Sequence, residues 1–190
     1  MGKFIFGLIV GLIIIPLCVY FYFSTGMAPV ATNASPMPFE EWFAHKALHA
    51  GMGKAAQQQS PIPADETNLS AGAQIYRDHC AVCHGLPLTP QTAISKGMYP
   101  KPPKLMEGTG VTDDPVGETY WKVNGGIRMT GMPGFQESLS TTQMWQVSLL
   151  CANADKLPAG TKTILVSGPA ASSTPAPPAT PATATPQTPK

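Results

Sequence analysis

Charged residues, cysteines and histidines are all scarce in this sequence. Only 12% of its 190 residues are charged, and 12 Lys and Arg nearly balance 11 Asp and Glu, for a formal net charge of +1. A balance this close to neutral does not identify a charged partner, and nothing in the sequence resembles a nucleic-acid-binding motif. A phosphate-binding loop and a hydrolase triad are also missing. These absences argue against the corresponding functions and direct attention to the 4 cysteines and 4 histidines.

Two of the cysteines and one histidine stand together in the pentapeptide C-A-V-C-H, which runs from Cys80 to His84. The C-x-x-C-H pattern is the attachment signature of c-type haem, in which each thiol forms a thioether with a haem vinyl group and the histidine coordinates the iron. A thioredoxin-like dithiol would need a strand before the motif, where this sequence reads as helix. A structural zinc site would need two further ligands at matching spacing. We therefore predict one haem c, bound covalently by Cys80 and Cys83 and coordinated by His84.

The N-terminal region is dominated by an apolar run from Phe4 to Phe23 that contains no charge. At 1.5 Å per residue, a helix of this length crosses the roughly 30 Å hydrocarbon core of a bilayer. We therefore expect residues 1–26 to be a transmembrane anchor that contacts membrane lipid through residues 4–23. The alternative is a cleavable signal peptide, although the apolar region of such a peptide is usually only about 7 to 15 residues long.

The charges on either side of this run predict its orientation. Lys3 precedes it, whereas the first charged residues after it are Glu40 and Glu41. Because Lys and Arg residues that flank a membrane span tend to stay on its cytoplasmic side, the short N-terminus should lie in the cytoplasm and the rest of the chain outside it. Haem attachment to C-x-x-C-H takes place on the outer side of bacterial inner membranes. We therefore expect a single-pass inner-membrane protein with its haem domain on the periplasmic side.

Two further segments flank the candidate haem domain. Residues 27–67 read as a linker that contains a short amphipathic helix, from Phe39 to Lys54, and then a polar, flexible stretch. In that helix His45 and His49 share one face, but two histidines are too few for a closed metal site, and we expect them to be exposed. The tail, residues 166–190, is rich in Pro, Ala and Thr and is predicted to be disordered.

The remaining block, residues 68–165, is the candidate globular domain. Its first helix should begin at the N-cap Ser70 and lead into the motif, and its last helix should run from Thr141 to Ala154 behind the N-cap Ser140. Gly72 has no side chain and would permit these two helices to cross closely. A covalent haem would add apolar mass to a core as small as this one.

Three stretches of this block resemble the mono-haem class I cytochromes c. In chain order they are the helix and haem-binding turn Ser70–Gly85, the proline-containing loop Pro102–Leu105 and the methionine loop Asn124–Phe135. The resemblance implies an all-α fold, with a small cytochrome c-like helical domain around one covalent haem, preceded here by a single N-terminal transmembrane helix.

The same resemblance implies that Met132, in a Gly-Met-Pro turn, is the second axial ligand of the haem iron. A thioether is a soft ligand suited to haem iron, and the turn can direct the sulfur inward. Met129 is the nearest rival and Met106 a distant one. A His/Met pair raises the reduction potential relative to two histidines.

A haem held by His84 and Met132 predicts a carrier of single electrons, not an enzyme in its own right. We expect a membrane-tethered c-type cytochrome that passes electrons between respiratory-chain partners, which would be redox proteins in or at the membrane. The alternative is a fixed cytochrome subunit of a larger membrane dehydrogenase or oxidase complex. A haem sensor or peroxidase is disfavoured, because methionine fills the sixth position and a di-haem peroxidase would need a second C-x-x-C-H motif.

Overall fold

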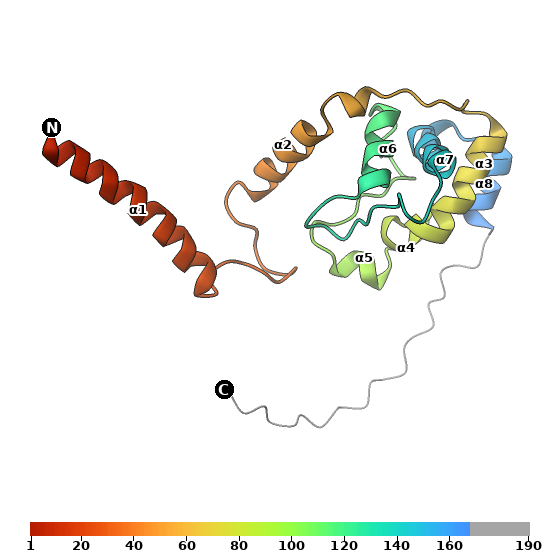
Figure 1. The fold of residues 1–190 in the computed structure, drawn as a ribbon. Helices are drawn as coiled ribbons and strands as arrows, with labels where there is room; N and C mark the ends of the chain where they lie inside the picture. The colour runs from red at the N-terminus through yellow and green to blue at the C-terminus, as the bar shows by residue number, and fades with distance from the viewer. Residues whose placement is uncertain (168–190) are drawn as a thin grey trace, which may run out of the picture.

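The computed structural model describes residues 1–167 as helices joined by loops, and it contains no β-strand within that range (Figure 1). The predicted all-α fold class is therefore confirmed. Most of the helices form a domain around the C-x-x-C-H motif, and α1 (Gly2–Ser24) stands apart from it. Of the tail predicted to be disordered, residues 168–190 lie outside the described part of the chain.

Helix α1 has the length and composition of a membrane span. Its 23 residues include one charged residue, Lys3, and none of them is buried by the rest of the described chain. Pro16 lies inside the helix, which continues through it. Length and composition alone suit a membrane anchor and an N-terminal signal sequence alike.

Helices α3 (Glu66–Ile75) and α7 (Thr141–Ala152) cross at the centre of the domain. A Cβ atom added to Gly72 would overlap the backbone of Gln146, whose carbonyl carbon would be only 2.7 Å away. The close crossing predicted from Gly72 is therefore confirmed. The apolar side chains around it, such as Leu150, are buried in a single core.

The two crossing helices differ in how well their starts were predicted. Ser140 caps α7 as expected, because its Oγ accepts a hydrogen bond from the Gln143 N–H at 3.3 Å and its own N–H donates to the Gln143 side chain at 2.9 Å. The N-cap predicted for α3 is wrong. Asp65 caps this helix by accepting a hydrogen bond from the Asn68 N–H at 2.9 Å, and Ser70 lies more than a turn inside.

A helix that the sequence analysis did not anticipate, α8 (Ala159–Val166), packs along α3. The hydroxyl oxygens of Ser70 and Thr161 lie 3.0 Å apart across this contact. Arg77 donates a hydrogen bond to the Ile164 carbonyl at 3.0 Å. Ser70 thus bonds to a distant helix and does not start its own.

Helix α6 (Val116–Gly125) packs against α7. At this contact Tyr120 stacks on Trp145, with ring centroids 3.9 Å apart. The shorter elements are the π-helical turn η2 (Tyr76–Cys80), α4 (Ala81–His84), α5 (Ala93–Gly97) and the 3-10 turn η3 (Ala154–Lys156).

The segment before the domain is partly packed against it. Helix α2 (Glu40–Met52) forms close to its predicted bounds and is followed by a 3-10 turn, η1 (Gly53–Gln57), which lies against α6. A Cβ atom on Gly117 of α6 would be only 2.7 Å from the Ala56 carbonyl oxygen. The flexible stretch predicted after Lys54 is therefore wrong for η1, because Ala56 is buried in this contact.

Candidate functional site

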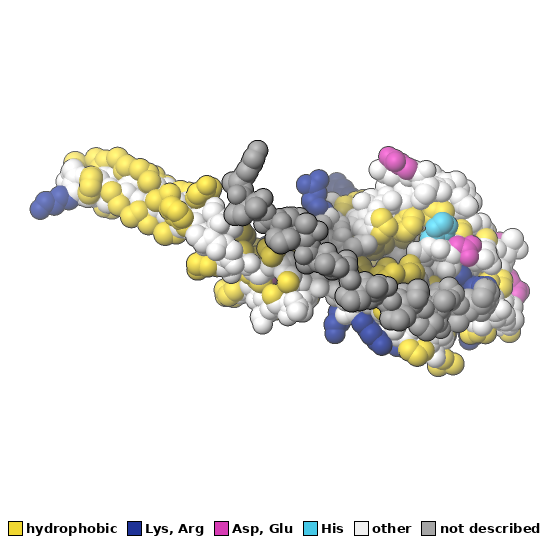
Figure 2. Space-filling model, turned by 90° about the horizontal axis from the view of Figure 1, so that it is seen from below, with side chains coloured by type: hydrophobic (Ala, Val, Ile, Leu, Met, Phe, Trp, Pro, Cys, Tyr) yellow, Lys and Arg dark blue, Asp and Glu magenta, His cyan; other side chains and the backbone are white. Residues whose placement is uncertain are grey.

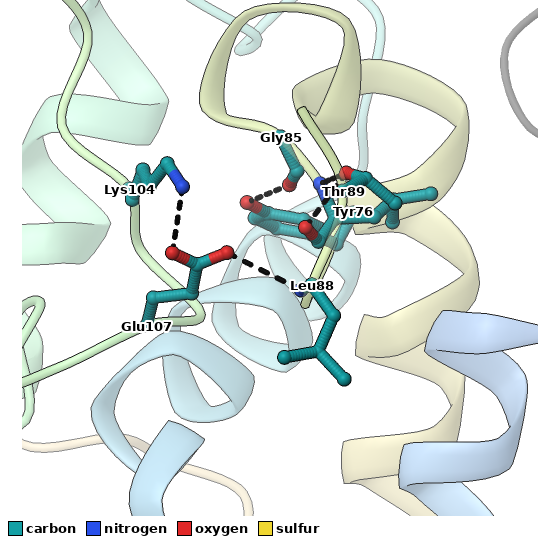
Figure 3. A network of polar contacts seen from close by, with 7 residues as sticks. Tyr76, Gly85, Leu88, Thr89, Lys104 and Glu107 are labelled. Atoms are coloured by element: carbon teal, nitrogen blue, oxygen red, sulfur yellow. Dashed lines mark hydrogen bonds and ion pairs between the residues drawn. The ribbon is translucent and has the colours of Figure 1, made fainter. Parts of the chain in front are cut away.

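The C-x-x-C-H motif lies at the end of the helical run that starts with α3. The run passes through the π-helical turn η2 and ends in α4, which carries Cys83 and His84. Such turns are frequent at functional sites. Gly85 ends α4 with a φ of 77°, and the buried Tyr76 donates its hydroxyl hydrogen bond to the Gly85 carbonyl at 2.8 Å (Figure 3). Tyr76 thereby fixes the residue that follows His84.

The backbone of the proline loop orients His84. Its Nδ1 lies 2.8 Å from the carbonyl oxygen of Pro103. Because a carbonyl oxygen can only accept, Nδ1 carries the proton, and the lone pair of the neutral imidazole is on Nε2. Burial lowers the pKa of His84, although the Pro103 carbonyl partly opposes this shift. A neutral imidazole whose Nδ1–H is held by a carbonyl is the form in which histidine commonly binds a metal ion.

The two cysteines of the motif carry unpaired thiols. Cys80 packs against the core, and burial, reinforced by the neighbouring Cys83, raises the pKa of Cys80 to about 12. A catalytic dithiol depends on a lowered thiol pKa, so this environment disfavours a redox-active dithiol. Within residues 1–167 no group of three or more His, Cys, Asp or Glu is arranged to hold a metal ion.

In the methionine loop, Met132 lies against the core and Met129 does not. The Met132 N–H donates to the Thr130 hydroxyl at 3.1 Å, and its carbonyl accepts from the Ile127 N–H at 3.2 Å. Met129 has a φ of 61° and is 94% exposed, so its sulfur is in solvent. Met106 packs against the same core from another loop. The preference for Met132 over Met106 therefore rests on the Gly-Met-Pro turn.

This methionine loop folds back tightly on the end of α6. The Phe135 N–H donates to the Val123 carbonyl at 2.9 Å. A Cβ atom on Gly126, whose φ is 68°, would be 2.5 Å from the backbone nitrogen of Gly134. Because these contacts join backbone to backbone, the path of the loop depends little on side-chain rotamers.

Glu107 connects the loop after the motif with the loop that orients His84. Its carboxylate accepts hydrogen bonds from the Leu88 N–H at 3.2 Å and from the Lys104 ammonium at 2.7 Å (Figure 3). The Lys104 hydrogen bond is the main reason why the pKa of Glu107 is lowered. Since Lys104 follows Pro103 directly, Glu107 braces the segment whose carbonyl holds the imidazole.

Within residues 1–167, Ser95 is the one buried polar side chain that lacks a hydrogen-bond partner. It lies in α5, whose N-cap Thr92 donates its hydroxyl to the Val82 carbonyl inside the motif at 2.6 Å. Just after α5, Met98 touches Gly131 of the methionine loop. Helix α5 thus connects the motif with the methionine loop. A buried unpaired hydroxyl at this place suits a site that a polar cofactor completes.

The residues present fit a covalently attached haem. They offer two unpaired thiols, an imidazole with a free Nε2 and a thioether that lies against the same core as Cys80. His45 and His49 do not join them, since both are exposed on α2 with ring centroids 6.5 Å apart. Sequence reasoning missed Glu107 and Ser95, because neither stands in a recognisable pattern.

Two known proteins or families are similar to the region that contains this site. The sequence model of the family described as Cytochrome c matches residues 69–149. The chain is also 28% identical over 96 residues to the quinohemoprotein alcohol dehydrogenase ADH IIB of Pseudomonas putida. That match covers 50% of this chain but 12% of the relative, so the chain spans only a small part of the relative's length. Residues 69–149 of this chain are therefore a cytochrome c domain.

Proposed function

We propose that this protein is a membrane-tethered electron carrier with one haem c, attached to Cys80 and Cys83 and ligated by His84 and Met132. A cytochrome c domain implies electron transfer through covalently bound haem, whose iron, when bound, takes up and releases one electron. The chain itself supplies the thiols, the two iron ligands and a buried surrounding.

The observation that carries the proposal is the hydrogen bond from His84 Nδ1 to the Pro103 carbonyl. It leaves Nε2 as the only lone pair of the imidazole, and Glu107 and Tyr76 brace the backbone on both sides of it. An electron carrier works best when its ligands keep one geometry in both oxidation states. An imidazole whose orientation is fixed by a hydrogen bond to a braced backbone carbonyl meets that need better than an imidazole that is free to rotate.

Electron delivery would take place at a membrane surface. Helix α1 supports an anchor that contacts lipid through residues 4–23, and the haem domain would then lie on the periplasmic side of a bacterial inner membrane. Partners would be redox proteins in or at that membrane. Extraction of membranes at alkaline pH tests the anchor: the full-length protein should stay with the lipid, and release of a soluble protein shortened at its N-terminus would show cleavage instead.

The visible absorption spectrum tests the ligands. In the oxidised full-length protein, made together with a cytochrome c maturation system, we expect the weak red charge-transfer band of methionine sulfur on ferric haem. Met132→Ala should abolish this band, whereas Met129→Ala should keep it because Met129 is in solvent. Haem attachment without the band in the unaltered protein would refute ligation by Met132 and favour a sensor or enzyme with an open or differently ligated iron.

A second candidate function is that of a fixed cytochrome subunit in a larger membrane dehydrogenase or oxidase complex. It is favoured by the similarity to a quinohemoprotein alcohol dehydrogenase. Extraction in a mild detergent distinguishes the two. Stable co-purification with other subunits would favour the fixed subunit, and a monomer would favour the mobile carrier.

A further inference from the structure

Helix α2 carries an exposed aromatic surface formed by Phe39, Trp42 and Phe43, which are 74%, 55% and 62% exposed. Together they line a shallow hollow, and the rings of Trp42 and Phe43 meet edge to face with centroids 4.8 Å apart. Figure 2 shows hydrophobic side chains over α1 and again over the segment that follows it. Adjacent exposed aromatic side chains on a short helix indicate a contact surface.

The aromatic surface does not pack on the rest of the described chain. Within residues 1–167, Met52 is the one buried residue of α2, and it lies at the opposite end of the helix from the aromatic surface. The connection to α1, residues 25–39, spans at most roughly 50 Å when fully extended. Met27 and Val30, which are both exposed, continue the apolar character along it. The aromatic surface therefore lies within roughly 50 Å of the outer end of α1.

The side chains around the aromatic surface suit a lipid headgroup region. Lys46 places its ammonium 5.0 Å from the centre of the Trp42 ring, where it can reach a lipid phosphate. Tryptophan is favoured at membrane interfaces, since its ring is apolar and its N–H is polar. Glu40 and Glu41 border the surface, so zwitterionic lipid suits it better than strongly anionic lipid.

Helix α2 is also joined to the haem domain at its C-terminal end. At its start the Tyr99 hydroxyl faces the Glu41 carboxylate at 3.5 Å, and this exposed contact is too long to fix the helix. At its end the chain continues into η1, where Ala56 is packed against Gly117 of α6. Because η1 follows α2 directly and packs on α6, the aromatic surface can move only a limited distance relative to the cytochrome c domain.

We propose that the aromatic surface of α2 rests in the outer headgroup region of the membrane and thereby orients the cytochrome c domain over that membrane. The proposal rests on the membrane tether of the proposed function. It replaces free swinging of the haem domain after Lys54 with movement of α2 and the domain as one body. The flexible part of the tether is then the segment between α1 and Phe39.

Lipid photolabelling tests the contact. The haem-loaded full-length protein is placed in phosphatidylcholine vesicles that contain some phosphatidylcholine with a diazirine near the glycerol, and labelled peptides are located by mass spectrometry after irradiation. We expect label on α1 and on the α2 peptide with Trp42 and Phe43. Val166, an exposed apolar residue at the end of α8, should carry none.

Substitution separates the contact from the anchor. In a double variant, Trp42→Ser with Phe43→Ser, labelling of α2 should fall about tenfold while labelling of α1 stays the same. The matched variant Val166→Ser should change neither. Linear dichroism of the haem in oriented bilayers should be clear in the unaltered protein and in Val166→Ser, and should fall towards zero in the double variant.

Each outcome decides a different point. Label on α1 without label on α2 would overturn the proposal, leave the tether intact and indicate a protein as the partner of the aromatic surface. Absence of label on α1 would refute the tether and the proposal together. Unchanged dichroism in the double variant would refute the orienting role of α2.

Discussion

The replacement Gly72→Ala probes the close crossing of α3 and α7 on which the haem domain is built. In an open helix this change would gain up to about 1 kcal/mol of helix propensity. Here the new methyl group would lie 2.7 Å from the Gln146 carbonyl carbon, and ordinary contact begins at 3.4 Å, so the helices must separate by at least about 0.7 Å. The obstacle is backbone and cannot rotate away. Overpacking of this kind costs about 1 to 3 kcal/mol, so after the gain in helix propensity we expect a net loss of about 1 kcal/mol.

Denaturation by guanidinium chloride measures this loss, with helix content followed by circular dichroism and the haem surroundings followed by absorbance. Gly51→Ala is the matched control, because Gly51 also lies within a helix but has nothing within 4 Å of its added Cβ atom. The control should be as stable as the unaltered protein or slightly more stable. Equal unfolding midpoints for Gly72→Ala and Gly51→Ala would refute the reasoning from the crossing.

Three further substitutions test the braces around His84 and the site near α5. Tyr76→Phe should lower the free energy of unfolding by about 1 to 3 kcal/mol, because it leaves the Gly85 carbonyl without its hydrogen bond; an unchanged midpoint would contradict this. The lowered pKa of Glu107 means that its contribution to stability is complete above the ordinary glutamate pKa and is lost as pH falls through the lowered value in the folded protein. Glu107→Gln should therefore flatten the fall of stability on acidification, and an unaltered pH profile would argue against the brace. Ser95→Ala should leave stability unchanged or raise it by about 1 kcal/mol, and a clear loss in the haem-loaded protein would show that the hydroxyl has a partner there.

The features that could be predicted are those encoded by neighbouring residues. The C-x-x-C-H motif needs only five positions, and the N-cap of α7 is visible in the spacing of Ser140 and Gln143. Gly72 was informative because only a missing side chain allows two helix backbones to approach so closely. The matched family region covers the motif and the methionine loop on which the resemblance to class I cytochromes c rests.

The features that were missed depend on partners distant in sequence. Ser70 looks like an N-cap, but its hydroxyl meets Thr161 on a helix that begins only after Pro158. That helix, α8, is short and includes Gly160, so packing against α3 must supply the stability that local propensity does not. From its sequence the turn η1 resembles a linker. It is buried only because Gly117 of α6, which is distant in the sequence, leaves room for it.

The main-chain acceptor for His84 also affects how the haem site would respond to mutation. Every residue type at position 103 carries a carbonyl, so replacing the proline side chain does not delete the group that bonds to Nδ1. Alanine scanning would therefore overlook the partner that decides which imidazole nitrogen keeps its proton. The choice of tautomer is encoded in the path of the loop, and changes that shift this path can alter which nitrogen of His84 is free to bind without replacing either residue of the pair.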